Sequence, residues 1–194
     1  MNLRILISSL CVLAGLAISA QDTINYTPLA DRLADYGQLT VAWDIDGLLD
    51  FTAPGLLEIV PRAALREQMT GLQSDDDMTV TFHDFFVDRI GEAVTLRGES
   101  FAPVTCHHGI TFELKSDAYR APVFAARMVR MLEKSYGDVR YDAATHRIDV
   151  RVEKTMYAIR RTPSAEWFFV EYRPENAGLM DLLIPPAVRE QLNN

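Results

Sequence analysis

The sequence predicts an α+β domain in which N-terminal helices pack on one face of a curved, mainly antiparallel sheet. Apolar residues recur at helical spacing in the first part of the chain and alternate with polar residues in much of the second half. One further helix, near residues 121–136, interrupts the series of strands. A doubly wound α/β fold would require regular alternation of strands and helices, which this order lacks.

The first twenty residues have the layout of a secretory signal peptide. A positive charge at Arg4 precedes an apolar stretch over residues 5–18, and small residues lead to an expected cleavage site near residues 19–20. The stretch is too short to predict a membrane span. We therefore expect an exported protein, periplasmic or secreted, whose mature domain covers residues 21–194 and has no membrane span.

The mature chain is acidic and holds one cysteine. Loss of Arg4 leaves 18 of the 19 basic residues against 27 acidic ones, a net charge of −9. Such a domain repels phosphate backbones, and no basic stripe is interleaved with aromatic residues, so we expect no nucleic-acid partner. Cys11 leaves with the signal, so Cys106 has no intramolecular partner and is expected to be buried and inert.

Helix signals open the mature domain. Thr27-Pro28 indicates an N-cap followed by proline at the first helical position. One helical face is formed by Leu29, Leu33, Tyr36 and Trp43. Residues 39–45 also alternate as a strand would, so the pattern leaves helix and strand open there. Asp44 is expected to cap a second helix that stops at Pro54-Gly55.

The middle of the chain changes from helices to strands. Residues 56–60 indicate a further apolar turn, Pro61 opens a third helix that ends near Gly71, and an acidic loop follows. The next three strand candidates are MTVTFHDFFV, EAVTLRGESF and VTCHHGITFEL. In the last of them, alternation places on one face Val104, Cys106, His108, Ile110, Phe112 and Leu114.

A helix, three strands and a helical tail complete the prediction. The helix over residues 121–136 stops at Gly137 and carries four apolar residues at helical spacing: Phe124, Met128, Met131 and Leu132. Three strands joined by short polar turns follow: HRIDVRVE, KTMYAIRR and EWFFVEY. The tail GLMDLLIPPAVREQL indicates an apolar helix, a Pro-Pro break and a last amphipathic turn.

The segment VAWDIDGLLD, residues 41–50, resembles the start of haloacid dehalogenase-like phosphohydrolases. That chemistry would use Asp44 as nucleophile and Asp46 as general acid, beside a magnesium ion held by carboxylates. It also requires Asp44 to end a buried strand and Thr or Val to follow the glycine, where Leu48 stands here. We favour a structural role, with Asp44 as a helix cap and Asp46 as a first-turn charge, and keep the phosphohydrolase as a remote alternative.

The run Cys106-His107-His108 has residue types that bind metals or act as nucleophiles. Adjacent strand residues point to opposite faces, so His107 and His108 cannot easily share one ion, and zinc needs at least three protein ligands. We therefore expect no metal and no cofactor, with His107 in solvent and His108 as a hydrogen-bonded core or pocket residue. Core packing is also preferred over ligand stacking for Trp43, Trp167, Phe168, Phe169 and Tyr172.

The segment WDIDGLLDFTAPGLLEIVPRAALREQM resembles the start of exported bacterial proteins similar to the nuclear transport factor 2-like, or cystatin-like, cone fold. Residues 44–49 match the Asp-capped second helix of that superfamily. Its helix end and hairpin resemble YGDVRYDAATHRIDVRVEKTMYAIRR, and its final strand resembles EWFFVEY. The helix near residues 121–136 departs from the family pattern, and the short strand usual after the second helix is hard to locate. The resemblance implies one cone-shaped domain.

This superfamily includes isomerases, dehydratases, cyclases and non-catalytic binding modules, so the resemblance transfers no activity. We expect a non-catalytic domain that binds a small apolar ligand or a protein in or around the cone. The alternative is an isomerase- or dehydratase-type enzyme with an acid/base pair in the pocket. A homodimer is compatible with the fold. No residue is assigned as catalytic, and the candidate pocket residues are His108, Cys106, Asp50, Asp84, Trp43 and Trp167.

Overall fold

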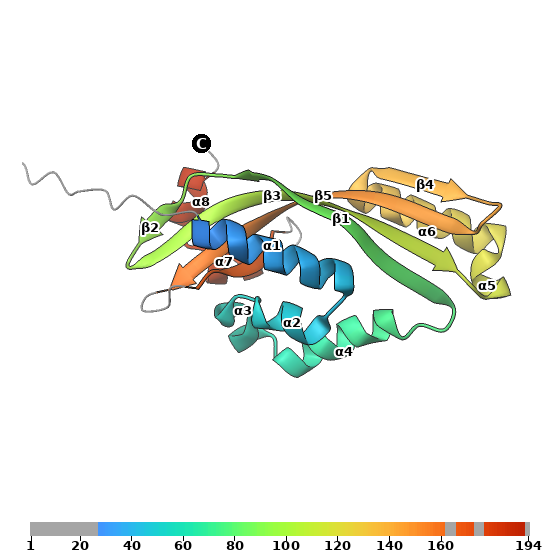
Figure 1. Cartoon of the computed structure of the whole chain (residues 1–194), viewed down its shortest axis with the longest axis horizontal. Coiled ribbons are helices and arrows are strands. Elements are labelled where there is room, and N and C mark those ends of the chain that lie inside the picture. Colours follow the sequence, from blue (N-terminus) through green and yellow to red (C-terminus); the bar gives the residue numbers. More distant parts are fainter. Residues whose placement is uncertain (1–26, 162–165, 173–176, 193–194) are drawn as a thin grey trace, which may run out of the picture.

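The α+β class is confirmed by the computed structural model, which describes residues 27–161, 166–172 and 177–192 (Figure 1). The signal peptide predicted over residues 1–20 lies outside the described residues. Within the described ranges, no helix has the length and apolar character needed to cross a bilayer. Helices pack on a six-stranded, mostly antiparallel sheet whose two central strands are unusually long.

Four helices form the N-terminal part of the domain: α1 (Thr27–Ala42), α2 (Ile45–Asp50), α3 (Pro54–Ile59) and α4 (Arg62–Gln73). The segment that the sequence left open is therefore helical. The backbone N–H of Trp43 donates to the carbonyl of Thr40. The N–H of Asp44 donates to the carbonyl of Leu39. With Trp43 at a φ of 49°, these two bonds form the left-handed closure that ends many helices.

Asp44 caps α2 as predicted, because its carboxylate accepts a hydrogen bond of 3.0 Å from the backbone N–H of Gly47. The predicted stop at Pro54-Gly55 is wrong. Helix α2 already ends at Asp50, and Pro54 begins α3, where a missing N–H costs nothing in the first turn. The third predicted helix is confirmed as α4.

The sheet has the order β1-β3-β5-β4, and β2 and β6 extend it by pairing with β3 and β5 respectively. The strands are β1 (Met78–Ile90), β2 (Val94–Leu96), β3 (Glu99–Leu114), β4 (Asp138–Asp142), β5 (Arg147–Arg161) and β6 (Phe168–Glu171). Strands β3 and β5 pair without interruption from Glu99↔Arg161 to Glu113↔Arg147. Alternation is therefore strict along both central strands, and each residue belongs to one of two faces.

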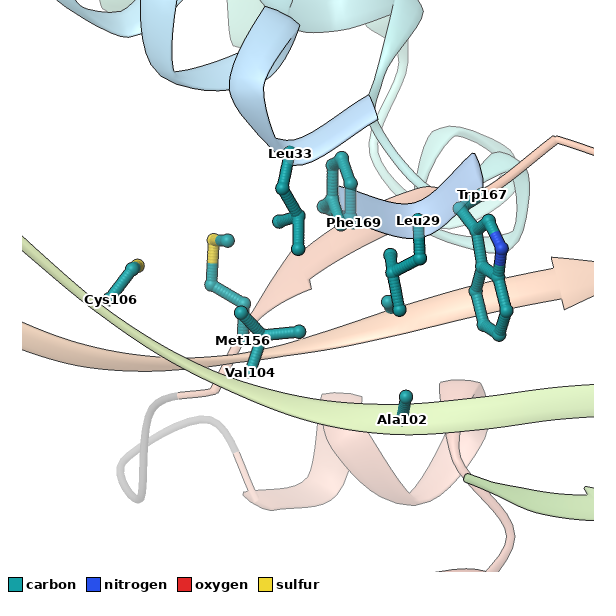
Figure 2. Packing of buried hydrophobic residues seen from close by; sticks show 9 residues of the cluster. Leu29, Leu33, Ala102, Val104, Cys106, Met156, Trp167 and Phe169 are labelled. Carbon is teal, nitrogen blue, oxygen red and sulfur yellow. The ribbon is translucent and has the colours of Figure 1, made fainter. Parts of the chain in front are cut away.

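The inner face of the sheet carries Ala102, Val104 and Cys106 on β3 and their partners on β5. Leu29 and Leu33 of α1 pack on this face, together with Trp167 and Phe169 (Figure 2). Farther along the same face, α6 (Pro122–Tyr136) covers Ile110, Leu114, Ile148 and Val150 with Ala125, Met128 and Leu132. Helix α5 (Asp117–Arg120) leads into α6. Met131, predicted as part of the apolar side of α6, is 59% exposed.

The outer face carries Phe101, Tyr157 and Ile159. Two C-terminal helices, α7 (Ala177–Leu183) and α8 (Pro186–Leu192), pack on this part of the sheet (Figures 1 and 2). The prediction that helices cover one face of the sheet is therefore wrong, because α7 and α8 cover part of the other face. Both faces of the sheet are buried near Phe101, since the consecutive β3 residues Ser100, Phe101 and Ala102 are all buried. A second covering layer is therefore required there.

Two of the predicted strand boundaries are also wrong. EAVTLRGESF is the hairpin between β2 and β3, with Arg97 and Gly98 both at positive φ in the turn. HRIDVRVE and KTMYAIRR are one continuous strand, β5, rather than two strands with a polar turn at Glu153-Lys154. The second correction places Lys154 in the middle of the sheet.

Candidate functional site

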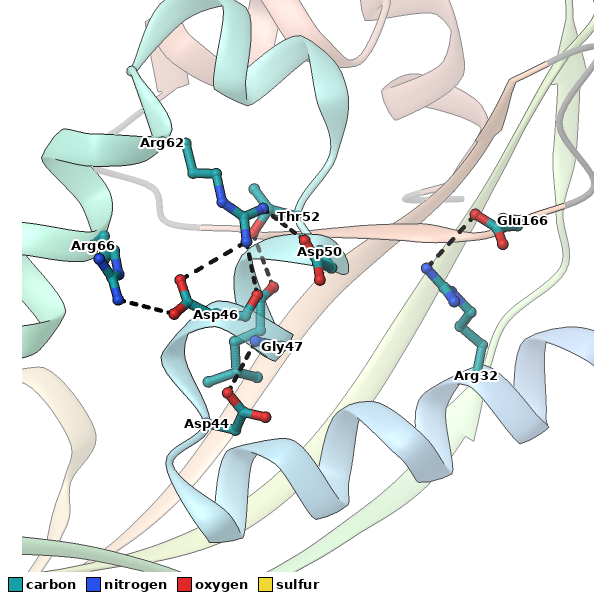
Figure 3. Close-up of polar contacts among 10 residues, drawn as sticks. Arg32, Asp44, Asp46, Gly47, Asp50, Thr52, Arg62, Arg66 and Glu166 are labelled. Atoms are coloured by element: carbon teal, nitrogen blue, oxygen red, sulfur yellow. Dashed lines mark hydrogen bonds and ion pairs between the residues drawn. The ribbon is translucent and has the colours of Figure 1, made fainter.

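The two acids of the Asp-x-Asp-Gly segment have structural partners. Asp44 caps α2, and the Asp46 carboxylate lies 3.0 Å from Nη2 of Arg66 and 4.0 Å from Nη2 of Arg62 on α4 (Figure 3). Asp44 lies between two helices, whereas phosphohydrolase chemistry requires it at the end of a parallel strand. These acids therefore fix α2 and tie α4 to it.

Of the candidate pocket residues, Asp50, Trp43 and Trp167 lie in separate places, whereas Asp84 and His108 both line one hollow of about 760 Å³. Asp50 is exposed on α2 and pairs with Arg62 at 2.8 Å. Asp84 is exposed on β1, with a carboxylate oxygen 2.7 Å from Nδ1 of His83. Trp43 packs on Phe82 at a ring-centroid distance of 4.3 Å. Trp167 is fully buried in the core beneath α1, as the core-packing prediction expects.

Cys106 and His108 lie together on the inner face, as the alternation predicted. Both are buried, and burial raises the pKa of the Cys106 thiol to about 11. The thiol is therefore protonated at neutral pH and a poor nucleophile, in agreement with the predicted inert cysteine. The prediction that His108 is hydrogen-bonded is wrong for one ring nitrogen, because Nδ1 is buried without a partner.

The surroundings of His108 keep its imidazole neutral. Its ring lies between Phe82 and Phe85, at centroid distances of 5.8 and 6.5 Å. Burial is the largest cause that lowers the pKa of His108 to about 3, and positive charge at Lys154, His83 and His107 adds to it. His108 is therefore an uncharged acceptor or donor in an aromatic environment at neutral pH.

Lys154 introduces a charge into the same inner face. It pairs in register with Cys106, and its Nζ lies 3.8 Å from a carboxylate oxygen of Glu171 on β6. Its ammonium also hydrogen-bonds the hydroxyl of Tyr36 on α1 and lies 5.7 Å from the centre of that ring. Burial by itself lowers the pKa of Lys154, but Tyr36 and Glu171 outweigh burial, so its pKa is raised and the side chain stays charged.

A cavity of about 200 Å³ is lined by Tyr36 and Glu171, the partners of Lys154, and by residues of α2, α3 and α4. Tyr36 and Glu171 form part of its wall, and the rest is mainly apolar, with Leu65 and Met69 of α4 closing one side. No residue of α4 is fully buried, and Arg62 and Arg66 form exposed ion pairs that link this helix to α2. The arrangement is a small, mainly apolar space whose polar side chains among the described lining residues are the Glu171 carboxylate, the Tyr36 phenol and the Thr52 hydroxyl.

A larger groove of about 690 Å³ separates α1 from β1. Small residues of α1 form one wall, and Phe85, Phe86 and Val87 of β1 form the other. Among the lining residues that the structure describes, Gln38 has the only polar side chain. The α1 residues that line it are Ala30, Leu33, Ala34, Gly37, Gln38, Val41 and Ala42. The geometry suits an apolar occupant rather than an ion.

Tyr36, Lys154 and Glu171 were not predicted to lie together. Lys154 was placed at the start of a separate strand, KTMYAIRR, because Glu153-Lys154 interrupts two apolar runs. The signal that could have located it is the alternation across the break, because Ile148, Val150, Val152, Lys154, Met156 and Ala158 all lie on the inner face of one strand. A lysine at such a position requires buried partners.

No group of three or more His, Cys, Asp or Glu side chains in the described part of the chain is arranged to hold a metal ion. Comparisons of the chain with known protein families, with curated proteins and with solved structures find no match.

Proposed function

We propose that this domain is a non-catalytic module that binds a small apolar ligand in the groove between α1 and β1. The observation that carries the proposal is the lining: among the described residues around this volume of about 690 Å³, Gln38 has the only polar side chain. Grooves of this size and composition are typical of small-molecule sites. Val41 stands at its border with 43% of its surface exposed, so apolar surface remains for a ligand to cover.

The shape of α1 supports this site. Ala30, Ala34 and Gly37 recur along one side of the helix, and Phe85 packs directly on Gly37, where an added Cβ would lie 2.3 Å from Cδ1 of that ring. Small side chains keep the space above them open, and a large side chain at position 34 would fill it.

The test uses N-phenyl-1-naphthylamine, an uncharged fluorophore, as the probe. Titration of the purified domain should raise its fluorescence to saturation at one equivalent. Ala34→Trp should weaken binding at least tenfold because the indole occupies the groove. Ala126→Trp is the matched control, since Ala126 is also an exposed helical alanine but lies on α6, away from the groove. Equal affinities for both variants would contradict the proposed site.

An isomerase- or dehydratase-type activity is a second candidate, favoured by the cavity beside Tyr36 and Glu171. A carboxylate and a phenol in an apolar cavity, with Lys154 behind them, form a set that can move a proton. Under this alternative, Glu171→Gln abolishes turnover of a substrate found by screening and leaves naphthylamine binding unchanged. Turnover that persists in Glu171→Gln would exclude the role of this carboxylate.

We also propose that the domain adopts the nuclear transport factor 2-like cone. Three features support it: α1 lies on the inner face, the Asp-capped α2 follows, and an isolated parallel bridge joins Thr52 to Phe169 where a short strand is usual in that superfamily. An experimental structure whose sheet did not wrap around α1 would contradict this assignment.

Export is proposed on the pattern of residues 1–20, in which one basic residue precedes an apolar stretch and small residues. The mature protein, recovered from a host with its native leader, should have lost about 20 residues by mass spectrometry of the periplasmic or secreted fraction. Recovery of the uncleaved chain from the cytoplasm would contradict export.

A further inference from the structure

One part of the outer face carries an ordered array of polar side chains. Beyond α7 and α8, four neighbouring strands place residues in register across the sheet: His83↔Gly109↔Arg151↔Asp138 in one row and Thr81↔Thr111↔Asp149↔Arg140 in the next. Two adjoining hollows of about 520 and 760 Å³ lie over these rows and share His83 and Asp149. We call this surface the polar array.

A chain of hydrogen bonds holds the polar array in place. The hydroxyl of Thr111 donates to Asp149 at 2.6 Å, and Nε2 of His83 lies 3.3 Å from the same hydroxyl oxygen. Nδ1 of His83 lies 2.7 Å from Asp84. Thr111 is only 7% exposed, so the chain is anchored beneath the surface while its two carboxylates reach solvent. Side chains held in this way lose little freedom when a ligand binds.

Flat ring surfaces lie beside these groups. The exposed ring of Phe86 stacks on His107 at a centroid distance of 4.9 Å and an interplanar angle of 13°. The His83 ring lies directly over Gly109, where an added Cβ would come within 2.0 Å of its Cε1. Exposed stacked rings on a polar surface offer a planar apolar platform.

The charges of the polar array are distributed in pairs. Arg147 lies 3.9 Å from Asp149, and Arg151 lies 4.0 Å from Asp138. Arg140 stands opposite Asp149 in the register. A phosphate or an acidic polymer would therefore meet a carboxylate beside each arginine, which is unfavourable. A ligand rich in hydroxyl groups, each both donor and acceptor, can instead bond to the guanidinium and the carboxylate of one pair.

We propose that the polar array binds a neutral oligosaccharide, with the Phe86–His107 stack under the C–H face of one sugar ring and with Asp149, Arg151 and Arg140 bonding hydroxyl groups. The hollows extend over several side chains in each direction, so a chain of sugar units fits them better than a single small molecule. This site is separate from the groove between α1 and β1, although Phe86 borders both.

The test is native affinity electrophoresis in gels that contain laminarin, dextran, galactomannan or xylan as neutral polysaccharides and alginate as an acidic one. At least one neutral polysaccharide should retard the domain, and alginate should not. Arg151→Ala and His107→Ala should each weaken that retardation at least tenfold. Both variants avoid Phe86, so naphthylamine binding in the groove should be unchanged.

The matched control is Arg130→Ala, which removes an exposed arginine from α6 and should leave retardation at the wild-type level. Circular dichroism of each variant checks that the fold is kept. The proposal is overturned by three results: no retardation by any of the four neutral polysaccharides, retardation by alginate alone, or equal retardation of Arg151→Ala and the wild type.

Discussion

His108 and Lys154 are two basic side chains on the same apolar face, and their surroundings have opposite effects on them. Lys154 meets the Tyr36 hydroxyl and the Glu171 carboxylate, which favour its charged form. His108 lies beside two phenylalanine rings, and the positive charge of Lys154 also favours its neutral form. Burial alone lowers the pKa of both groups, so the partners decide which one stays charged.

This contrast predicts how acid destabilises the domain. His108 has a pKa of about 3 when folded and 6.5 as its ordinary value, so the unfolded chain binds a proton between these pH values that the folded chain does not. The free energy of unfolding should therefore fall as the pH drops from about 6.5 towards 3, by up to about 1.4 kcal/mol per pH unit. Urea unfolding at pH 7, 6 and 5 measures it.

His108→Leu should lack this component, because leucine binds no proton, so its stability should fall less steeply than that of the wild type over the same range. His107→Gln is the control, since His107 points to the outer face and its charge is the smallest of the causes that lower the pKa of His108, so this variant should keep most of the pH dependence. Parallel pH profiles for the wild type and His108→Leu would show that this imidazole does not contribute.

At the scale of elements, the second helix depends on its first residue. Helix α2 has six residues, so its own hydrogen bonds hold it only weakly, and the carboxylate of Asp44 satisfies an N–H at its start. Asp44→Ala should lower the free energy of unfolding by about 1 kcal/mol, whereas Asp44→Ser should retain most of it because a hydroxyl also caps. Urea denaturation at pH 7 distinguishes the two variants, and equal losses would argue against a capping role.

Several elements could be predicted from the sequence because their signals are local. The cap at Asp44, the glycine stop of α6 and the face shared by Cys106 and His108 follow from neighbouring residues alone. The split of β5 was wrong because Glu153-Lys154 looks like a turn, and only partners distant in sequence, Tyr36 and Glu171, make a lysine tolerable there. The polar array was missed for the same reason: its rows join four strands whose register cannot be read from any one of them.

At the scale of the whole molecule, β3 and β5 join two separate parts of the core. One part lies under α1 and contains Trp167, and the other lies under α6 and contains Leu132. The two strands run 16 and 15 residues through both parts without a break in register. Because the same backbone ladder crosses both parts, loss of either core should weaken the pairing that supports the other, and the domain should unfold in one transition.

Leu132→Ala tests this coupling. The leucine is a buried residue of α6, so its truncation should cost about 2–5 kcal/mol. Trp167 lies under α1, whereas Trp43 packs on Phe82, which borders the core under α6. The measurement therefore uses a Trp43→Phe background, in which Trp167 is the one tryptophan of the sequence. If the domain is one cooperative unit, the urea midpoint followed by tryptophan fluorescence should fall together with the midpoint followed by far-ultraviolet circular dichroism. Met131→Ala, on the exposed side of the same helix, should move neither midpoint by much. A fluorescence midpoint that stays at the wild-type value while the dichroism signal changes earlier would show that the α6 end unfolds on its own.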